Sequence, residues 1–273
     1  MKNEIHPEGV RINKFLSEAG ICSRREADRH IEAGEVTIDG KKAVMGDRIF
    51  PGQKVALCGK TVRQEKEKIL LAVNKPRGIV CTAQKREKDN IIDFMKYPKR
   101  IYPVGRLDKD SEGLLLMTNQ GDLVNKIMRA GNRHEKEYIV TVDRVVTEEF
   151  LRGMSGGVYL EELDVTTRKC PVTKIGKRQF RIILTQGYNR QIRRMCEVFS
   201  YHVTRLVRVR IMNIKLGDLK PGTWRNLTDE EMGRLTEMLK GSSSKTVIPE
   251  KEDRSKSYGK KRGIIDLDLS VPE

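Results

Sequence analysis

Strand-like and helix-like patterns alternate without a regular order over the segment from Ile69 to about Lys240. A doubly wound parallel sheet would need a repeating strand–helix–strand period, and this segment has none. The pattern therefore predicts an α+β fold, with a largely antiparallel mixed sheet flanked by helices and loops. We expect this larger domain to cover residues 69–240.

The first 62 residues are expected to form a separate small domain made of two helices and a hairpin. Ser23 and Glu26 have the spacing of a capping box, which starts the second helix. Val36–Ile38 is β-branched and is followed by Asp39 and Gly40, a pair typical of a tight hairpin turn. The charged residues 63–68 are expected to be a linker to the larger domain.

The last segment, residues 241–273, is rich in Lys, Glu, Asp and Ser. Such a composition lacks the apolar residues that a packed core requires. We expect a mobile charged tail, which either makes loose contacts to RNA or has no role of its own.

The chain carries 54 Lys and Arg against 38 Asp and Glu, a formal net charge of +16. An excess of this size favours a polyanionic partner, because clustered cations gain affinity by releasing the counterions of phosphates. Most of the excess lies in the larger domain. A smaller cluster, Arg24, Arg25 and Arg29, lies on the second helix. That cluster is either an ordinary solvated helix face or a surface for RNA phosphates.

Several classes of protein are excluded by what the sequence lacks. The longest apolar run, Ile69–Val73, is far below the ~20 residues that span a bilayer, and no apolar signal segment follows Met1. The five cysteines are scattered, as is usual for reduced thiols in the cytoplasm, and no His or Cys spacing indicates a metal. No nucleotide-binding glycine motif occurs. We expect a cytoplasmic monomer without membrane contact, metal or cofactor.

The polar segment Gly105–Gly113 separates an apolar approach from the strand-like run Leu114–Met117. It places the carboxylate of Asp108 on a loop between sheet elements, two residues after Arg106. Taken alone, Asp108 could simply cap local amides. The segment also imitates the start of a calcium loop, but its twelfth position is Asn119, where a bidentate Glu is required.

A further helix is predicted by periodicity near residue 190. Apolar residues recur at the spacing of a buried helical face, and these are Ile192, Met195, Cys196 and Phe199. Arg190, Arg193 and Arg194 fall on the opposite face, near the N-terminus of the helix. This cluster suits a phosphate or a buried carboxylate, although basic helix faces are also common without any such role.

The N-terminal segment resembles the S4-type RNA-binding module. The resemblance rests on three stretches, Arg11–Leu16, Cys22–Ala27 and Gly34–Gly40. It implies binding of structured RNA by the small domain, without implying any reaction.

The string Gly-Arg-Leu-Asp-x-x-Ser-x-Gly-Leu-Leu, which begins at Gly105, resembles the catalytic motif of pseudouridine synthases. This resemblance implies that Asp108 is the catalytic residue. The stretch Glu135–Val142 is similar to a second motif of that family, which implies that Tyr138 stacks on the target base. Without the resemblance, Tyr138 would be a half-buried aromatic residue of a strand.

The stretch Gln186–Met195 resembles the third motif of the family. It implies that Arg193 pairs with the catalytic Asp and that Ile192 packs near the base. Arg190 and Arg194 are then expected to contact the RNA backbone. We expect Arg106 to fill the space that the extruded base leaves, or to hold a phosphate.

Asn74–Gly78 is similar to the first motif of the family. By its residues alone, this motif is the end of a strand followed by a turn, which suggests an architectural role. We nevertheless include Lys75 among the candidate RNA-binding residues, together with Arg24, Arg25 and Arg29 of the small domain.

An S4-like module followed by this catalytic domain is the layout of the bacterial branch of the family that modifies ribosomal RNA. The resemblance implies action on 23S ribosomal RNA or its large-subunit precursor, with a transfer RNA as a further substrate. The alternatives are a synthase for small-subunit or transfer RNA only, a non-catalytic S4-type assembly factor, and a DNA-binding regulator. The implied reaction is a redox-neutral isomerisation and needs no cofactor. Whether Asp108 attacks the sugar or removes a sugar proton stays open.

Overall fold

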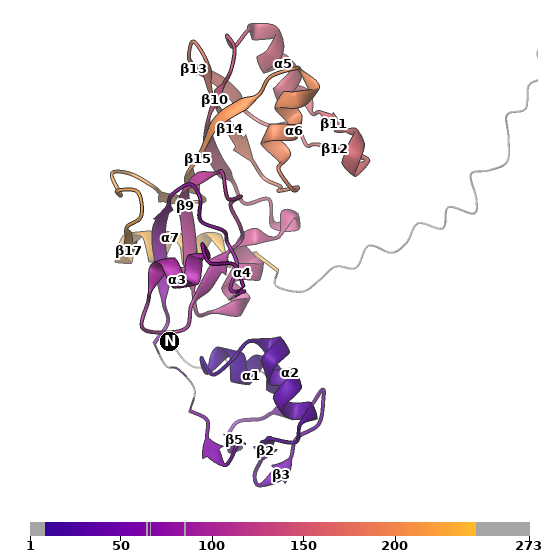
Figure 1. Cartoon of the computed structure of the whole chain (residues 1–273), viewed down its shortest axis with the longest axis vertical. Helices are drawn as coiled ribbons and strands as arrows, with labels where there is room; N and C mark the ends of the chain where they lie inside the picture. The colour runs from indigo at the N-terminus through magenta and orange to yellow at the C-terminus, as the bar shows by residue number, and fades with distance from the viewer. Residues whose placement is uncertain (1–8, 64, 66, 85, 244–273) are drawn as a thin grey trace, which may run out of the picture.

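The computed structural model describes residues 9–63, 65, 67–84 and 86–243 (Figure 1). Its N-terminal part contains the two expected helices, α1 (Ile12–Glu18) and α2 (Arg24–Glu32). The capping box before α2 is present, since Ser23 accepts from the backbone of Glu26 and Glu26 accepts from the backbone of Ser23. This part of the prediction is confirmed.

The expected hairpin is also present in the N-terminal part. β2 (Val36–Ile38) pairs with β3 (Lys41–Lys42), and the turn between them has positive φ at Asp39 and Gly40. A four-stranded sheet in the order β3-β2-β5-β6 includes β5 (Val55–Leu57) and β6 (Lys60–Thr61). Two further strands, β1 (Val10–Arg11) and β4 (Arg48–Ile49), pair with each other. The helices close over this sheet with a small apolar core of their own.

The larger part is built on a nine-stranded sheet, in agreement with the predicted α+β fold. Its main order is β13-β14-β10-β15-β9-β7-β17, with β16 beside β15 and β8 beside β9. The strands are β7 (Leu70–Lys75), β8 (Tyr102–Val104), β9 (Glu112–Thr118), β10 (Lys136–Val142), β13 (Val172–Gly176), β14 (Gln179–Leu184), β15 (Val203–Ile211), β16 (Ile214–Lys215) and β17 (Trp224–Asn226). Every pairing in this sheet is antiparallel except the one between β15 and β9.

The parallel contact between β15 and β9 divides the sheet into two halves. Only two residue pairs join these strands, Val207 with Glu112 and Arg208 with Gly113. Gly113 has φ +103, and a Cβ at this position would lie 2.4 Å from the carbonyl oxygen of Arg208. The absence of a side chain therefore allows β9 to approach β15 closely.

Each half of the sheet has its own apolar packing. In Figure 1, α5 (Glu148–Gly156) and α6 (Gln191–Val198) lie beside the half that contains β10, β13 and β14. The β7–β9 half is buried on both faces. Alternate residues of its strands face α4 (Gly121–Met128) and α7 (Asp229–Met238) on one side and α3 (Ile91–Met95) on the other.

The apolar face predicted for the helix near residue 190 is present in α6. Ile192, Met195 and Cys196 are buried under α6. The capping box of Thr228 and Glu231 begins α7. Four short elements complete the described part: β11 (Tyr159–Leu160), β12 (Val165–Thr166) and the 3-10 turns Ala130–Asn132 and Glu161–Leu163.

Among the described residues, polar contacts from two side chains connect the N-terminal part to the larger part. Lys14 of α1 forms an ion pair with Asp122 of α4 at 2.6 Å, and Arg100 donates to the carbonyl and hydroxyl oxygens of Ser17. No helix within the described residues is both long and apolar enough to traverse a bilayer. The predicted tail lies outside the described residues from residue 244 onward.

Candidate active site

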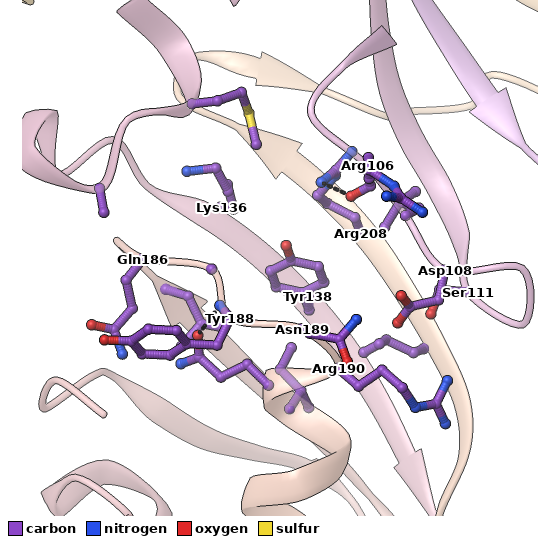
Figure 2. A pocket seen from close by; sticks show the side chains of 18 residues that line it. Arg106, Asp108, Ser111, Lys136, Tyr138, Gln186, Tyr188, Asn189, Arg190 and Arg208 are labelled. Atoms are coloured by element: carbon purple, nitrogen blue, oxygen red, sulfur yellow. Dashed lines mark hydrogen bonds between the residues drawn. The ribbon is translucent and has the colours of Figure 1, made fainter. Parts of the chain in front are cut away.

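A pocket of about 380 Å³ opens where the two halves of the sheet meet. It is lined by the loop before β9, by β10 and β15, and by the segment that leads into α6. These elements bring together residues that are far apart in the sequence, including Asp108, Tyr138 and Ile192. Three of the four predicted motifs therefore converge on one cavity (Figure 2).

Asp108 lies on the loop between β8 and β9, as predicted, and its side chain is partly exposed in the pocket. The residues around it are fixed: Leu107 is buried, and its amide donates to the Cys81 sulfur at 3.4 Å. The amide of Ser111 donates to the Asp108 carbonyl at 3.1 Å, which closes a turn. A carboxylate is thus presented to the pocket from a rigid loop.

Tyr138 is on β10, opposite Ile182 on one side and Arg208 on the other. Its ring is half-buried and packs against the apolar clusters of both halves of the sheet. In Figure 2 the ring occupies the middle of the pocket, with Asp108 to one side. A flat aromatic face here is available to a planar ligand.

Arg193 is where the structure departs most from expectation. Periodicity puts it on the polar face of α6, but its side chain is only 8% exposed. Its guanidinium forms an ion pair with Asp110 at 3.0 Å and donates to the Asp110 carbonyl and the Ser111 hydroxyl. The predicted partner was Asp108, so the expected direct pair is replaced by a clamp on the two residues that end the Asp108 loop.

Burial lowers the pKa of Arg193, while the charges of Asp110 and Asp108 oppose this shift. Asp108 therefore lies within electrostatic range of the guanidinium without forming an ion pair to it. Arg193 also donates to the carbonyl of Val203, which ties α6 to the start of β15. These contacts tie the Asp108 loop, α6 and β15 together at one guanidinium.

The neighbouring arginines of α6 behave differently from each other. Arg190 is exposed, lines the pocket and reaches Asp110 at 3.3 Å. Arg194 donates to the carbonyl of Asn189 and forms an ion pair with Glu162, and it does not line the pocket. Of these two arginines, only Arg190 lines the cavity.

Arg106 is exposed and lines the pocket, so its predicted contact with RNA stays a prediction. Lys75, in contrast, is fully buried, and its ammonium donates to the Pro76 carbonyl at 2.9 Å. A surface contact between Lys75 and RNA is therefore wrong for this structure. Burial also lowers the pKa of Lys75. The architectural interpretation of its motif fits better.

Arg24, Arg25 and Arg29 are all exposed on α2, away from the pocket residues. Arg24 is the one that turns toward the larger part, where it lines a hollow of about 260 Å³ with Tyr102 and Gly121. Arg25 and Arg29 are solvated, which agrees both with an ordinary solvated helix face and with a surface for RNA phosphates.

Sequence reasoning missed two buried cations that line the pocket, Lys136 and Arg208. Burial, together with the charge of Arg208, lowers the pKa of Lys136 to about 8. Both residues lie in strands that carry several charged side chains, which by sequence alone are expected at a solvated face. Lys136 falls within the second motif, two residues before Tyr138, and that spacing was the available clue. Among the described residues, no cluster of His, Cys, Asp and Glu could hold a metal ion.

Comparisons with known proteins agree with this geometry. Residues 69–198 match the family model of RNA pseudouridylate synthases, and residues 10–44 match the S4 domain. A solved structure described as a pseudouridylate synthase aligns with a TM-score of 0.62 and 26% identity, covering 83% of this chain and 100% of that one.

Two curated relatives are similar over most of their length. The dual-specificity RNA pseudouridine synthase RluF of Escherichia coli K12 is 52% identical over 96% of this chain and 90% of its own. The ribosomal large subunit pseudouridine synthase B of Bacillus subtilis is 34% identical over 82% and 95%, respectively. This chain belongs to the RNA pseudouridine synthase family and is an isomerase of that family with an N-terminal S4 domain.

Proposed function

We propose that this enzyme converts a uridine of 23S ribosomal RNA, or of its large-subunit precursor, to pseudouridine, with Asp108 as the catalytic carboxylate. The observation that carries the proposal is the convergence of Asp108, Tyr138 and Ile192 on one pocket. The RNA target is supported by the relatives, one of which is a large-subunit enzyme.

The reaction begins with extrusion of the uridine, because a stacked nucleotide cannot present its C1′ and N1 atoms to a carboxylate. Extrusion costs a few kcal/mol. Stacking of the base on Tyr138 offsets part of this cost, since such a contact contributes about 1–3 kcal/mol. Arg106, at the rim, is placed to hold the RNA around the vacated position.

Cleavage of the bond between C1′ and N1 leaves the electron pair on the uracil and positive character on the sugar. The ionised carboxylate of Asp108 stabilises the sugar, either by bonding to C1′ or by accepting a sugar proton. The uracil then turns and C5 bonds to C1′. Loss of the C5 proton and protonation of N1 complete an isomerisation in which no atom is gained or lost.

Arg193 acts through the loop in this scheme. By binding Asp110 and Ser111 it holds the turn that carries Asp108. Such preorganisation matters because a displacement of about 1 Å can cost about 10²-fold in rate. Arg193 is therefore a positioning residue, and Asp108 is the residue that touches the reacting atoms.

We propose a division of labour between residues 1–62, which bind structured RNA, and residues 69–240, which carry out the isomerisation. We propose that the enzyme acts as a monomer. An RNA substrate of this kind favours a cytoplasmic location.

A transfer RNA is the second candidate substrate. The relative that is 52% identical is described as having dual specificity, which supports a second RNA target for this chain as well. Mapping of pseudouridines in total RNA from cells with and without the gene tests both targets. Loss of a 23S site supports the main proposal, whereas loss only in transfer RNA or in small-subunit RNA contradicts it.

The role of Asp108 is tested by Asp108→Ala and Asp108→Asn in a pseudouridine-formation assay on 23S RNA fragments. Both variants are expected to lose all measurable activity while their affinity for RNA stays within a few fold of wild type. An equal collapse of affinity or of thermal stability would mean that Asp108 supports the fold instead of the reaction.

A further inference from the structure

Two cations that line the pocket are almost completely buried. Lys136 is 4% exposed and Arg208 is 1% exposed. Within the described residues neither forms an ion pair with a carboxylate, unlike Arg193, which is bound by Asp110. Buried charges without a partner are costly, so their presence calls for a reason.

Both cations also keep N–H donors that the described part of the protein does not use. The ammonium of Lys136 donates to the carbonyl of His134 at 3.1 Å, which occupies one of its three N–H groups. Arg208 donates to the carbonyls of Leu114 and Arg106, but its Nη2 is buried without a partner. The part of the pocket that they line is therefore positive and rich in donors, and its natural complement is an anionic oxygen.

The position of the two cations relative to Tyr138 suggests which oxygen this is. Lys136 precedes Tyr138 by two residues on β10, and Arg208 is the register partner of Tyr138 on β15. Figure 2 shows Lys136 and Asp108 on opposite sides of the Tyr138 ring. With C1′ at Asp108 and the base on Tyr138, the uracil ring points toward the cations.

We propose that Lys136 and Arg208 bind the carbonyl oxygens of the detached uracil and stabilise its negative charge, a role that rests on the proposed function. When the bond between C1′ and N1 breaks, the electron pair is delocalised over N1, O2 and O4. Two preorganised cations in a pocket also lined by Met128, Leu184 and Leu206 meet that charge with little competition from water. The charge disappears again when C5 has bonded to C1′ and N1 is protonated.

The test compares Lys136→Met with wild type in single-turnover assays at saturating RNA. Loss of one donor to a developing anion lowers the rate by about 10²–10³-fold. We expect a loss of that size for Lys136→Met, a partial recovery in Lys136→Arg, and RNA affinity within about threefold of wild type. Lys174→Met, at an exposed position on β13 of the same sheet, is the matched control and should keep the wild-type rate.

A second substrate separates charge stabilisation from a structural effect. Fluorine at C5 withdraws electrons, so a 5-fluorouracil anion needs less stabilisation than a uracil anion. Consumption of 5-fluorouridine in the same RNA should therefore suffer at least tenfold less from Lys136→Met than conversion of uridine does. A structural defect would slow both substrates equally and would overturn the proposal.

The remaining outcomes are equally distinct. If Lys136→Met weakens RNA binding and leaves the saturated rate unchanged, the cations bind a backbone phosphate and the proposal is wrong. If wild type itself forms no pseudouridine in ribosomal or transfer RNA, the proposed function fails. If wild type is active and Lys136→Met is equally fast, only this inference fails.

Discussion

Arg25 and Arg29 on α2 are exposed, whereas Lys136 and Arg208 in the pocket are almost completely buried. Exposed cations keep their hydration and cost the fold little. They can add affinity for any RNA by releasing counterions. Buried cations lose their hydration on folding and reduce stability unless something compensates them. The exposed cations of α2 therefore suit general attraction to RNA, whereas the buried cations of the pocket suit one specific ligand.

The largest loss of stability is expected from Gly113→Ala, because this substitution would push against the backbone of Arg208 in β15. The new Cβ would lie 2.4 Å from the Arg208 carbonyl oxygen and 2.8 Å from its backbone nitrogen. The backbone cannot move aside as a flexible side chain could. Overpacking therefore lowers the free energy of unfolding by about 1–3 kcal/mol, in addition to the strain of a non-glycine residue at positive φ.

Gly78→Ala is the matched control for this prediction. Gly78 also has positive φ, +88, but a Cβ there meets nothing within 4 Å. Chemical denaturation should show a lower free energy of unfolding for Gly113→Ala than for Gly78→Ala. Equal values would mean that β9 and β15 can separate at no cost.

The second-largest change in the free energy of unfolding is expected from Lys136→Met, which should stabilise the protein at pH 7. Burial lowers the pKa of Lys136 from 10.5 to about 8, so the folded state carries a penalty for the charge below pH 8. Removal of that charge should raise the free energy of unfolding by about 1–3 kcal/mol.

The pH dependence of this gain follows from proton binding. Between pH 8 and 10.5 the unfolded wild-type chain binds more protons at this lysine than the folded protein does, so wild-type stability rises with pH. The advantage of Lys136→Met should therefore shrink as the pH approaches 10. Thermal and chemical unfolding at pH 7 and pH 10 measure this; a destabilised variant at pH 7 would show that Lys136 is a structural residue.

The smallest effect is expected on the exposed side of the comparison. Arg25→Ala combined with Arg29→Ala should weaken RNA binding by a few fold. The slope of the logarithm of the binding constant against the logarithm of the salt concentration should fall in magnitude by about one for each lost phosphate contact. The rate at saturating RNA should not change. Arg24 is left intact because it also lines the hollow beside Tyr102.

Arg234→Ala is the control for this double variant, since Arg234 is exposed on another helix, α7. Binding assays at several salt concentrations compare the two. A double variant that binds as tightly as the Arg234→Ala protein would mean that α2 presents an ordinary solvated face to water.

Local sequence patterns predicted much of the fold because local contacts determine it. The capping boxes at Ser23 and Thr228 depend on residues three positions apart, and both are present. The loop position of Asp108 follows equally from its neighbours in sequence. Such features require no knowledge of the distant chain.

The burial of Arg193 and Arg208 could not be predicted in this way. Arg193 is covered by Asp110 and Ser111, more than 80 positions earlier in the chain. Arg208 lies in β15 near Arg205 and Arg210, as on a solvated strand, yet its guanidinium is held by the carbonyls of Leu114 and Arg106, about 100 positions earlier in the chain. The periodicity of apolar and charged residues along a helix or strand shows which side chains share a face. It does not show which distant segment packs on that face.

The two-pair contact between β9 and β15 makes the sheet narrowest at the point where the pocket opens. Each half has its own apolar core, and Tyr138 packs against clusters on both sides of this seam. Arg193 already reaches across this seam, from α6 in one half to Asp110 and Ser111 beside the other. A nucleotide that touches both Asp108 and Tyr138 would add a further tie between the two halves of the sheet.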